Sequence, residues 1–236
     1  MDLLDKKNIA VIFDLDGTLL DTLGDITDSV NHVIASRGFA TRSESDVRRF
    51  IGNGAKRLVE RMMYSKNGEL DVTVADPELA DVCCEEFKTY YGEHVNVKTA
   101  PYAGVIEVLE ILCSKGIPMA VVTNKPDASA KKLCTAHFDK YIKIALGDAE
   151  GRSRKPDPST LLETIGELGC DSAIYVGDSE VDIKVARNAR IPSVILTWGF
   201  RDRQLLEENG AEILVDDAHG LLCALSDLLG IDLGEL

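Results

Sequence analysis

The sequence predicts an α/β fold, a Rossmann-like doubly wound parallel sheet with an inserted α-helical segment. Short apolar runs alternate with segments of helical periodicity, which is typical of a sheet with helices on both faces. Several runs are almost continuously apolar, as expected for strands that are buried on both sides. The segment from about residue 23 to 97 breaks this alternation and shows helical periodicity alone. We therefore expect a sheet core that is interrupted by a helical insertion.

The predicted strands are short runs rich in Val, Ile and Ala. We expect strands at residues 9–13, 117–123, 142–146, 173–176 and 193–197, and a weaker strand at 212–215. Helices are expected at residues 104–114, 126–136, 158–168, 180–189 and 218–229. This alternation assigns residues 1–20 and 98–236 to the α/β core domain.

The insertion, residues 21–97, is predicted to be a helical cap domain. Helical periodicity occurs near residues 26–36, 45–50, 55–63 and 78–91, and no run in this segment is a convincing strand. Asp76 followed by Pro77 marks a helix start. Because the insertion directly follows the first strand, we expect it over the carboxyl end of the sheet, where it could act as a lid.

Composition restricts the class of protein. The chain has 236 residues, of which 45% are hydrophobic and 28% are charged, as in ordinary soluble domains. The net charge of −14 argues against nucleic acid and anionic membrane surfaces as partners. No apolar stretch approaches the roughly 20 residues of a membrane helix, and residues 1–7 do not resemble a secretory signal. Six scattered cysteines without a Cys-x-x-Cys pair indicate a reducing compartment, so we expect a cytoplasmic protein.

Two aspartates follow the first predicted strand, in the run Asp14-Leu15-Asp16-Gly17-Thr18. Open α/β sheets place their sites at the carboxyl ends of strands, and residues two apart in an extended segment project the same way. One carboxylate can attack an electrophile or hold a metal while the other moves protons. From these residues alone, a solvated acidic turn is an equally good interpretation.

Further polar residues follow other predicted strands. Thr123 and Asn124 end the strand at 117–123, and Asp178 and Asp182 follow the strand at 173–176. Lys155 stands before a Pro-Asp-Pro run that opens a helix and restricts the backbone. Taken singly, each group has a simpler explanation as a turn, a solvated lysine or helix-start acids. Because all of them lie near strand ends, one joint site explains them better.

In this order the residues resemble the haloacid dehalogenase superfamily, and the resemblance covers the whole chain. The run from Asp14 to Thr18 is similar to its first motif, and Thr123-Asn124 to its second. Lys155 is similar to the third motif, and Gly177-Asp178 with Asp182 to the fourth. The resemblance implies a Rossmann-like core and phosphoryl transfer that depends on Mg²⁺. The branch that removes halide lacks the second aspartate of the first motif. Asp16 therefore points to ester hydrolysis, in which an alkoxide leaving group needs a proton donor.

The resemblance also implies catalytic and phosphate-binding roles. Asp14 would attack phosphorus and form an aspartyl-phosphate. Asp16 would protonate the leaving oxygen and then deprotonate the water that hydrolyses the intermediate. Thr123 and the backbone amide of Asn124 would bind the phosphoryl oxygens, and Lys155 would offset their charge.

The implied cofactor is Mg²⁺, which prefers oxygen ligands. Its protein ligands would be the side chains of Asp14 and Asp178 and the backbone carbonyl of Asp16. Asp182 would orient Lys155 or a metal-bound water without binding the metal itself.

The predicted cap carries the residues that point to a substrate. The run VRRFIGNGA at 47–55 looks like the cap signature of phosphoglycolate phosphatases. Glycines before a helix leave backbone N–H groups free to bind an anion. We therefore predict that Gly52, Asn53 and Gly54 bind the substrate carboxylate, with Arg48 adding positive charge. The same glycines could instead make only a tight turn.

The expected activity is hydrolysis of a small phosphorylated metabolite, 2-phosphoglycolate, to glycolate and phosphate. A sugar-phosphate phosphatase, a pyrophosphatase and a phosphomutase similar to β-phosphoglucomutase are the alternatives that share this core. A phosphate-binding protein without catalysis would be expected to lack Asp14 or Asp16, and both are present. The sequence leaves a monomer and a homodimer equally open.

Overall fold

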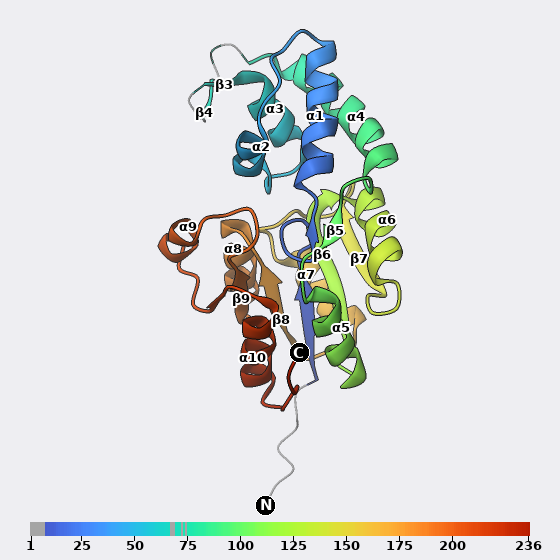
Figure 1. Cartoon of the computed structure of the whole chain (residues 1–236), viewed down its shortest axis with the longest axis vertical. Coiled ribbons are helices and arrows are strands. Elements are labelled where there is room, and N and C mark those ends of the chain that lie inside the picture. Colours follow the sequence, from blue (N-terminus) through green and yellow to red (C-terminus); the bar gives the residue numbers. More distant parts are fainter. Residues whose placement is uncertain (1–7, 67–68, 72, 74) are drawn as a thin grey trace, which may run out of the picture.

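A six-stranded parallel sheet forms the centre of the computed structural model (Figure 1). The structure describes residues 8–66, 69–71, 73 and 75–236; residues 1–7, in which the sequence predicts no secretory signal, lie outside this range. The sheet has the order β10-β9-β8-β1-β6-β7, which confirms the predicted α/β class. Its strands are β1 (Ile9–Phe13), β6 (Met119–Pro126), β7 (Ile144–Asp148), β8 (Ser172–Gly177), β9 (Ser193–Leu196) and β10 (Leu214–Val215).

Helices cover both faces of this sheet. The side chains of β1 point alternately to the two faces, and on each face they pack with helices in an apolar cluster. Val11 and Phe13 belong to the cluster that contains α5 (Val105–Ser114), α6 (Asp127–Phe138) and α10 (Ala218–Leu229). Ala10 and Ile12 belong to the cluster that contains α7 (Ser159–Glu167) and α8 (Glu180–Ala189). None of the described helices has the length and apolar character needed to cross a membrane.

The strand order places the carboxyl end of β1 at a switch point of the sheet. β1 pairs with β6 on one side and with β8 on the other. From β6 the chain continues outward to β7, and it then crosses to β8 and continues to β9 and β10. Ligands of doubly wound sheets bind at such a point, just outside the carboxyl ends of the strands.

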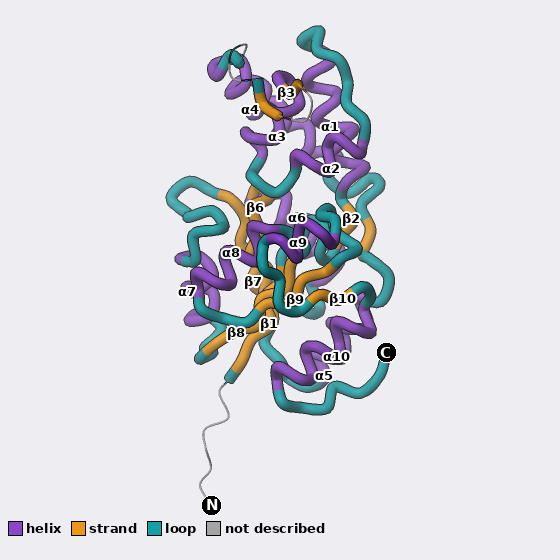
Figure 2. The backbone as a smooth tube through the Cα atoms, turned by 90° about the vertical axis from the view of Figure 1, so that its left-hand side faces the viewer, coloured by secondary structure: helices purple, strands orange, loops and turns teal. Residues whose placement is uncertain are grey.

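Four helices lie above this end of the sheet and pack on one another (Figures 1 and 2). They are α1 (Leu23–Ser36), α2 (Glu44–Phe50), α3 (Ala55–Tyr64) and α4 (Pro77–His94). We call them the α1–α4 layer. Two chain segments connect this layer to the sheet, one before α1 and one after α4. They are joined by the carboxylate of Asp25 in α1, which accepts hydrogen bonds from the backbone N–H groups of Val97, Lys98 and Thr99. The chain therefore leaves and re-enters the core at one place.

The structure corrects the prediction that the inserted segment contains no strand. β3 (Ser65–Lys66) and β4 (Glu69–Leu70) form a small antiparallel pair there. A second short pair, β2 (Leu20–Asp21) with β5 (Ala100–Pro101), lies where the chain leaves and re-enters the core. The helix α9 (Arg203–Glu208) was also not predicted. Strands of two residues have no measurable periodicity, so their pairing depends on contacts that are distant in sequence.

The strand β6 differs from its prediction in a way that affects the site. It begins at Met119, not at residue 117, and it continues past Thr123 to Pro126, so that α6 begins one residue later than predicted. Its pairing with β7 shifts register between Val122 and Pro126. Asn124 and Lys125 are buried within this extension although both are polar. Buried polar side chains need partners, and these residues find them in the site.

Candidate active site

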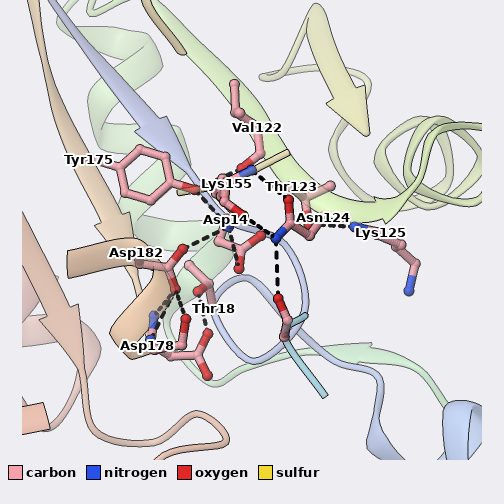
Figure 3. A network of polar contacts seen from close by, with 12 residues as sticks. Asp14, Thr18, Val122, Thr123, Asn124, Lys125, Lys155, Tyr175, Asp178 and Asp182 are labelled. Carbon is pink, nitrogen blue, oxygen red and sulfur yellow. Dashed lines mark hydrogen bonds and ion pairs between the residues drawn. The ribbon is translucent and has the colours of Figure 1, made fainter. Parts of the chain in front are cut away.

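Three adjacent strands bring the predicted residues together above the sheet (Figure 3). Asp14 directly follows β1, Thr123 lies in β6 and Asp178 directly follows β8. Lys155 arrives from the loop between β7 and α7, and Asp182 lies in the first turn of α8. All five are buried. The predicted core residues therefore meet at one point.

Lys155 is the central cation of this group. Its Nζ lies 2.9 Å from Oδ2 of Asp14 and donates to Oδ1 of Asp182 at 2.7 Å. It also donates to the hydroxyl of Tyr175 at 2.9 Å. Burial alone lowers the pKa of Lys155, but Asp14 and then Asp182 raise it well above its ordinary value. Lys155 therefore stays charged and offsets the neighbouring carboxylates.

Asp182 caps a helix and holds Lys155 at the same time. Its Oδ2 accepts hydrogen bonds from the backbone N–H groups of Asp178 and Ser179 and from the Ser179 hydroxyl. With Ser179 it forms the capping box at the start of α8. Because its other oxygen binds Lys155, both oxygens of Asp182 have protein partners.

Asp14 and Asp178 have the properties of metal ligands. One carboxylate oxygen each from Asp14, Asp178 and Asp182 lie within 4.8 Å of one another. Within the described residues, Oδ1 of Asp14 is buried and has no hydrogen-bond partner. Buried acceptors are rarely left unsatisfied, and a set of carboxylate oxygens suits a hard divalent cation. Asp182 already pairs with the Lys155 ammonium, whereas Asp14 has a free oxygen and Asp178 pairs with no cation among the described residues. Asp14 and Asp178 are therefore the side chains that fit such a cation.

The pKa values of the two carboxyl groups reflect the same crowding. Burial raises the pKa of Asp14 to about 6, although Lys155 opposes this shift. Burial, followed by repulsion from Asp182 and Asp14, raises the pKa of Asp178 to about 8. A bound divalent cation would reverse this effect, since it favours the charged form.

Two glycines make room for the carboxylate of Asp178. A Cβ on Gly17 would lie 2.4 Å from Oδ2 of Asp178, and a Cβ on Gly199 would lie 2.3 Å from it. Thr18 donates to Oδ1 at 3.0 Å, and the backbone N–H of Phe200 donates to Oδ2 at 2.7 Å. Gly17 and Thr18 of the first motif therefore fix the position of Asp178.

Asn124 connects three parts of the site through its side chain. Its Oδ1 accepts the backbone N–H of Lys155 at 2.9 Å, and its Nδ2 donates to the carbonyl oxygen of Lys155 at 3.0 Å. The same Nδ2 donates to the carbonyl oxygen of Gly52, in the α1–α4 layer, at 3.2 Å. The Asn124 side chain thus aligns the Lys155 loop and one loop of that layer.

Lys125 is a site residue that was not predicted from the sequence. Its Nζ donates to Oδ1 of Asp16 at 2.7 Å and also contacts the hydroxyl of Tyr91 in α4. Lys125 is only 4% exposed. One pattern in the sequence indicates Lys125 as a site residue: it follows Thr123 by two residues, just as Asp16 follows Asp14. Equal spacing at the ends of neighbouring parallel strands can place two such pairs side by side.

A cavity of about 60 Å³ lies between the core and the α1–α4 layer. Asp14, Asp16 and Thr123 line its core side, and Gly52 and Gly54 line its other side. The rest of that second side is mainly apolar, formed by Ile26, Ile51, Ala55, Leu58, Phe87 and Tyr91. Gly54 directly precedes α3, whose first backbone N–H groups have no acceptor within the helix.

Three residues predicted to bind the substrate lie outside the lining of this cavity. They are Arg48, Asn53 and Lys155. The guanidinium of Arg48 donates to the carbonyl oxygens of Gly199 at 2.6 Å and Phe200 at 3.1 Å. Arg48 therefore contacts the backbone of a core loop.

The sequence of this chain is similar to those of known hydrolases. Residues 11–196 match the family of haloacid dehalogenase-like hydrolases. A phosphoglycolate phosphatase of Agrobacterium fabrum is 37% identical over 224 residues, covering 92% of each chain. A phosphoglycolate phosphatase of Rhodobacter capsulatus is 37% identical over 199 residues, covering 83% of this chain and 87% of the relative.

Solved structures are similar over nearly the whole chain. A protein of Lactobacillus delbrueckii subsp. bulgaricus is 33% identical, with a TM-score of 0.87 over 95% of this chain and 99% of its own. A predicted phosphoglycolate phosphatase of Haemophilus somnus is 28% identical, with a TM-score of 0.81 over 94% of this chain and 99% of its own. The similarity therefore includes the α1–α4 layer as well as the sheet.

Proposed function

Because the chain belongs to the haloacid dehalogenase-like hydrolase family and is a phosphatase, we propose that 2-phosphoglycolate is its substrate. The products would be glycolate and phosphate. Support comes from the two relatives named phosphoglycolate phosphatase, of which this chain covers 92% and 87%. The observation that carries the proposal is that Asp14 and Asp16 both line one side of a small cavity, whose opposite wall is largely apolar.

The proposed reaction begins with Asp14 as the nucleophile. Oδ2 of Asp14 is held by Lys155, while Oδ1 has no partner among the described residues. As a carboxylate oxygen of Asp14 forms a bond to phosphorus, the bond from phosphorus to the glycolate oxygen breaks. Asp16 gives its proton to that leaving oxygen.

Hydrolysis of the aspartyl-phosphate completes the cycle. Asp16 takes a proton from a water molecule, whose oxygen attacks phosphorus while the bond to Asp14 breaks. Phosphate leaves, Asp14 is regenerated as a carboxylate and Asp16 again carries a proton. Thr123 and the backbone N–H of Asn124 bind the phosphoryl oxygens during both steps.

We propose Mg²⁺ as the cofactor of this site. The side chains of Asp14 and Asp178 and the backbone carbonyl of Asp16 would hold it, and the unpartnered oxygen of Asp14 supports this assignment. A bound Mg²⁺ offsets the repulsion between the carboxylates and the phosphate ester. Asp182 holds Lys155 in place through its 2.7 Å hydrogen bond.

The α1–α4 layer would act as a cap domain, residues 21–97, that selects the ester. Gly52 and Gly54 line the cavity, so their loop and the start of α3 can offer backbone N–H groups to the substrate carboxylate. Asn53 and Arg48 would contribute from outside the lining, Arg48 by its charge. The apolar residues beside them favour a small ester over a sugar phosphate, because buried hydroxyl groups of a sugar would lack partners there.

A substrate panel tests this proposal. Phosphate release is measured with Mg²⁺ for 2-phosphoglycolate, glucose 6-phosphate, glucose 1-phosphate and pyrophosphate. We expect 2-phosphoglycolate to have the highest kcat/KM. A higher value for a sugar phosphate or for pyrophosphate would overturn the substrate and leave the reaction class in place. Conversion of glucose 1-phosphate to glucose 6-phosphate without net phosphate release would favour a phosphomutase.

A further inference from the structure

We propose that Lys125 is a positioning residue for proton transfer, which holds one oxygen of Asp16 and leaves the other to exchange the proton. The inference rests on the proposed role of Asp16 as acid and base. Within the described part of the chain, Lys125 supplies the only hydrogen bond that the Asp16 carboxylate receives, to Oδ1 at 2.7 Å. The second oxygen, Oδ2, has no protein donor there. Lys125 therefore distinguishes the two oxygens of a group whose chemistry needs only one.

The burial of this pair makes the contact strong. The Lys125 side chain is 1% exposed and the Asp16 side chain is 13% exposed. Charge-assisted hydrogen bonds are short and strong, and little solvent screens a pair that is buried to this extent. Without the ammonium group, the Asp16 carboxylate would rotate more freely about its side-chain bonds.

The other side of Lys125 is held by the α1–α4 layer. Its Nζ contacts the hydroxyl of Tyr91 and lies 4.5 Å from the centre of the Tyr91 ring, a cation–π distance. Burial raises the pKa of Tyr91 well above its ordinary value, so the phenol stays neutral. Asp16 in the core is therefore oriented by a lysine that α4 also holds.

Esters with different leaving groups can show whether Lys125 positions Asp16 or has only a structural role. An alkoxide needs a proton as it leaves, whereas 4-nitrophenolate leaves without one. The variant Lys125→Met removes the charge and retains most of the side-chain volume. We expect its kcat/KM to fall about 10- to 100-fold for ethyl phosphate and for 2-phosphoglycolate, a part of the usual acid–base contribution. For 4-nitrophenyl phosphate we expect a loss of less than about threefold.

A double-mutant cycle tests whether Lys125 acts through Asp16. The reference is Asp16→Asn, whose kcat/KM should itself fall far more for ethyl phosphate than for 4-nitrophenyl phosphate. We compare kcat/KM because it reports formation of the aspartyl-phosphate and not its hydrolysis, which is common to all esters. Adding Lys125→Met to Asp16→Asn should change kcat/KM for ethyl phosphate by less than about threefold. The matched control is Lys132→Met, since Lys132 also reaches α4, through the Gly92 carbonyl, but does not contact Asp16. Thermal unfolding with Mg²⁺ confirms that each variant is folded.

Several outcomes would overturn the role of Lys125. They are an equal loss on all three esters, a loss of similar size in the Asp16→Asn background, or no loss at all. A loss confined to 2-phosphoglycolate would instead make Lys125 a ligand of the substrate carboxylate. If Lys125→Met does not fold, Tyr91→Phe, which keeps the ring and removes the hydroxyl, is measured on the same esters and should show a weaker form of the same pattern.

Failure of the proposed function would be seen separately. Asp16→Asn without any dependence on the leaving group would remove Asp16 from the acid role, whatever Lys125 does. A different physiological ester would not affect the comparison of ethyl phosphate with 4-nitrophenyl phosphate.

Discussion

Arg201 donates from Nη1 to the backbone carbonyl oxygen of Arg48 at 3.0 Å, and so joins the loop after β9 to the end of α2. Arg48 makes the reverse connection, because its guanidinium donates to the carbonyl oxygens of Gly199 and Phe200. The N–H of the same Phe200 binds the carboxylate of Asp178. One short loop of the core therefore contacts both the α1–α4 layer and a candidate metal ligand.

Replacing Arg201 should loosen this connection. Arg201 also donates to the buried carbonyl oxygen of Ile51 and to the partly buried carboxylate of Glu180, so Arg201→Met leaves one buried and two partly buried acceptors without this donor. At about 1–3 kcal/mol for an unsatisfied buried group, we expect the melting temperature to fall by about 2–4 °C for each kcal/mol lost. We also expect KM to rise, because Arg201 itself lines the cavity together with Ile51, Gly52 and Gly54. Arg203→Met, at an exposed arginine paired with Asp216, is the matched control and should change neither value. Unchanged melting and KM in Arg201→Met would contradict the prediction.

Asp14→Asn tests the nucleophile. The amide keeps the shape of the side chain but cannot form the acyl-phosphate, so kcat should fall by at least about 1,000-fold. Phosphate release measures the loss, and circular dichroism with thermal unfolding shows whether the fold persists. Nearly full activity in a folded variant would exclude Asp14 as the nucleophile.

The stability of the metal-free protein should depend on pH through Asp178. Its pKa of about 8 in the folded protein lies above the ordinary value of about 4 in an unfolded chain. The folded state therefore binds the proton more tightly, and stability should fall as pH rises from about 4 to about 8. Melting temperatures with EDTA should show this decline, and Mg²⁺ should reduce it by compensating the charge.

Asp178→Asn is the control for that dependence. It removes the titrating group, so the decline with pH should become shallower and the stabilisation by Mg²⁺ should largely disappear. If Asp178→Asn melts with the same pH dependence and the same Mg²⁺ response as the unmodified protein, Asp178 neither titrates in this range nor binds the metal.

Gly54→Ala tests the proposed carboxylate-binding loop. Gly54 has φ of 84° and ψ of 164°, a region that only glycine adopts without strain. We expect KM for 2-phosphoglycolate to rise about 3- to 10-fold if backbone groups at this helix start bind the carboxylate. Ethyl phosphate, which has no carboxylate, should show a smaller change. Gly38→Ala, at a glycine with φ of 79° and open space around it, controls for strain away from the cavity. Equal effects on both esters would count against a carboxylate site at Gly54.

Local pattern was sufficient for much of the fold. The β1 strand has an apolar side chain at every position, and the acids Asp14 and Asp178 stand directly after strands, so their meeting at one edge follows from a parallel sheet. The end of β6 could not be predicted in the same way. Asn124 and Lys125 look like turn residues in sequence, and they continue the strand only because the site supplies buried partners for them.

The contacts of the charged side chain of Arg48 could not be predicted from local pattern either. Its position beside the glycine loop predicts a charge near the substrate, but that position gives no sign that its guanidinium donates to the carbonyl oxygens of a loop about 150 residues further along the chain. Whether a cation is free for a ligand depends on such distant acceptors, which no local pattern contains.

By itself, the sequence determined the α/β class and the helical insertion, because strand and helix periodicity are local properties. The order of the four motifs followed from the resemblance to a known family. Only the tertiary structure decided how the charges pair: Lys125 with Asp16 and Tyr91, and Arg48 and Arg201 with each other's loops. These contacts join residues that are 34 to 153 positions apart. Their strength depends on burial between the sheet and the α1–α4 layer, which exists only after the two have packed together.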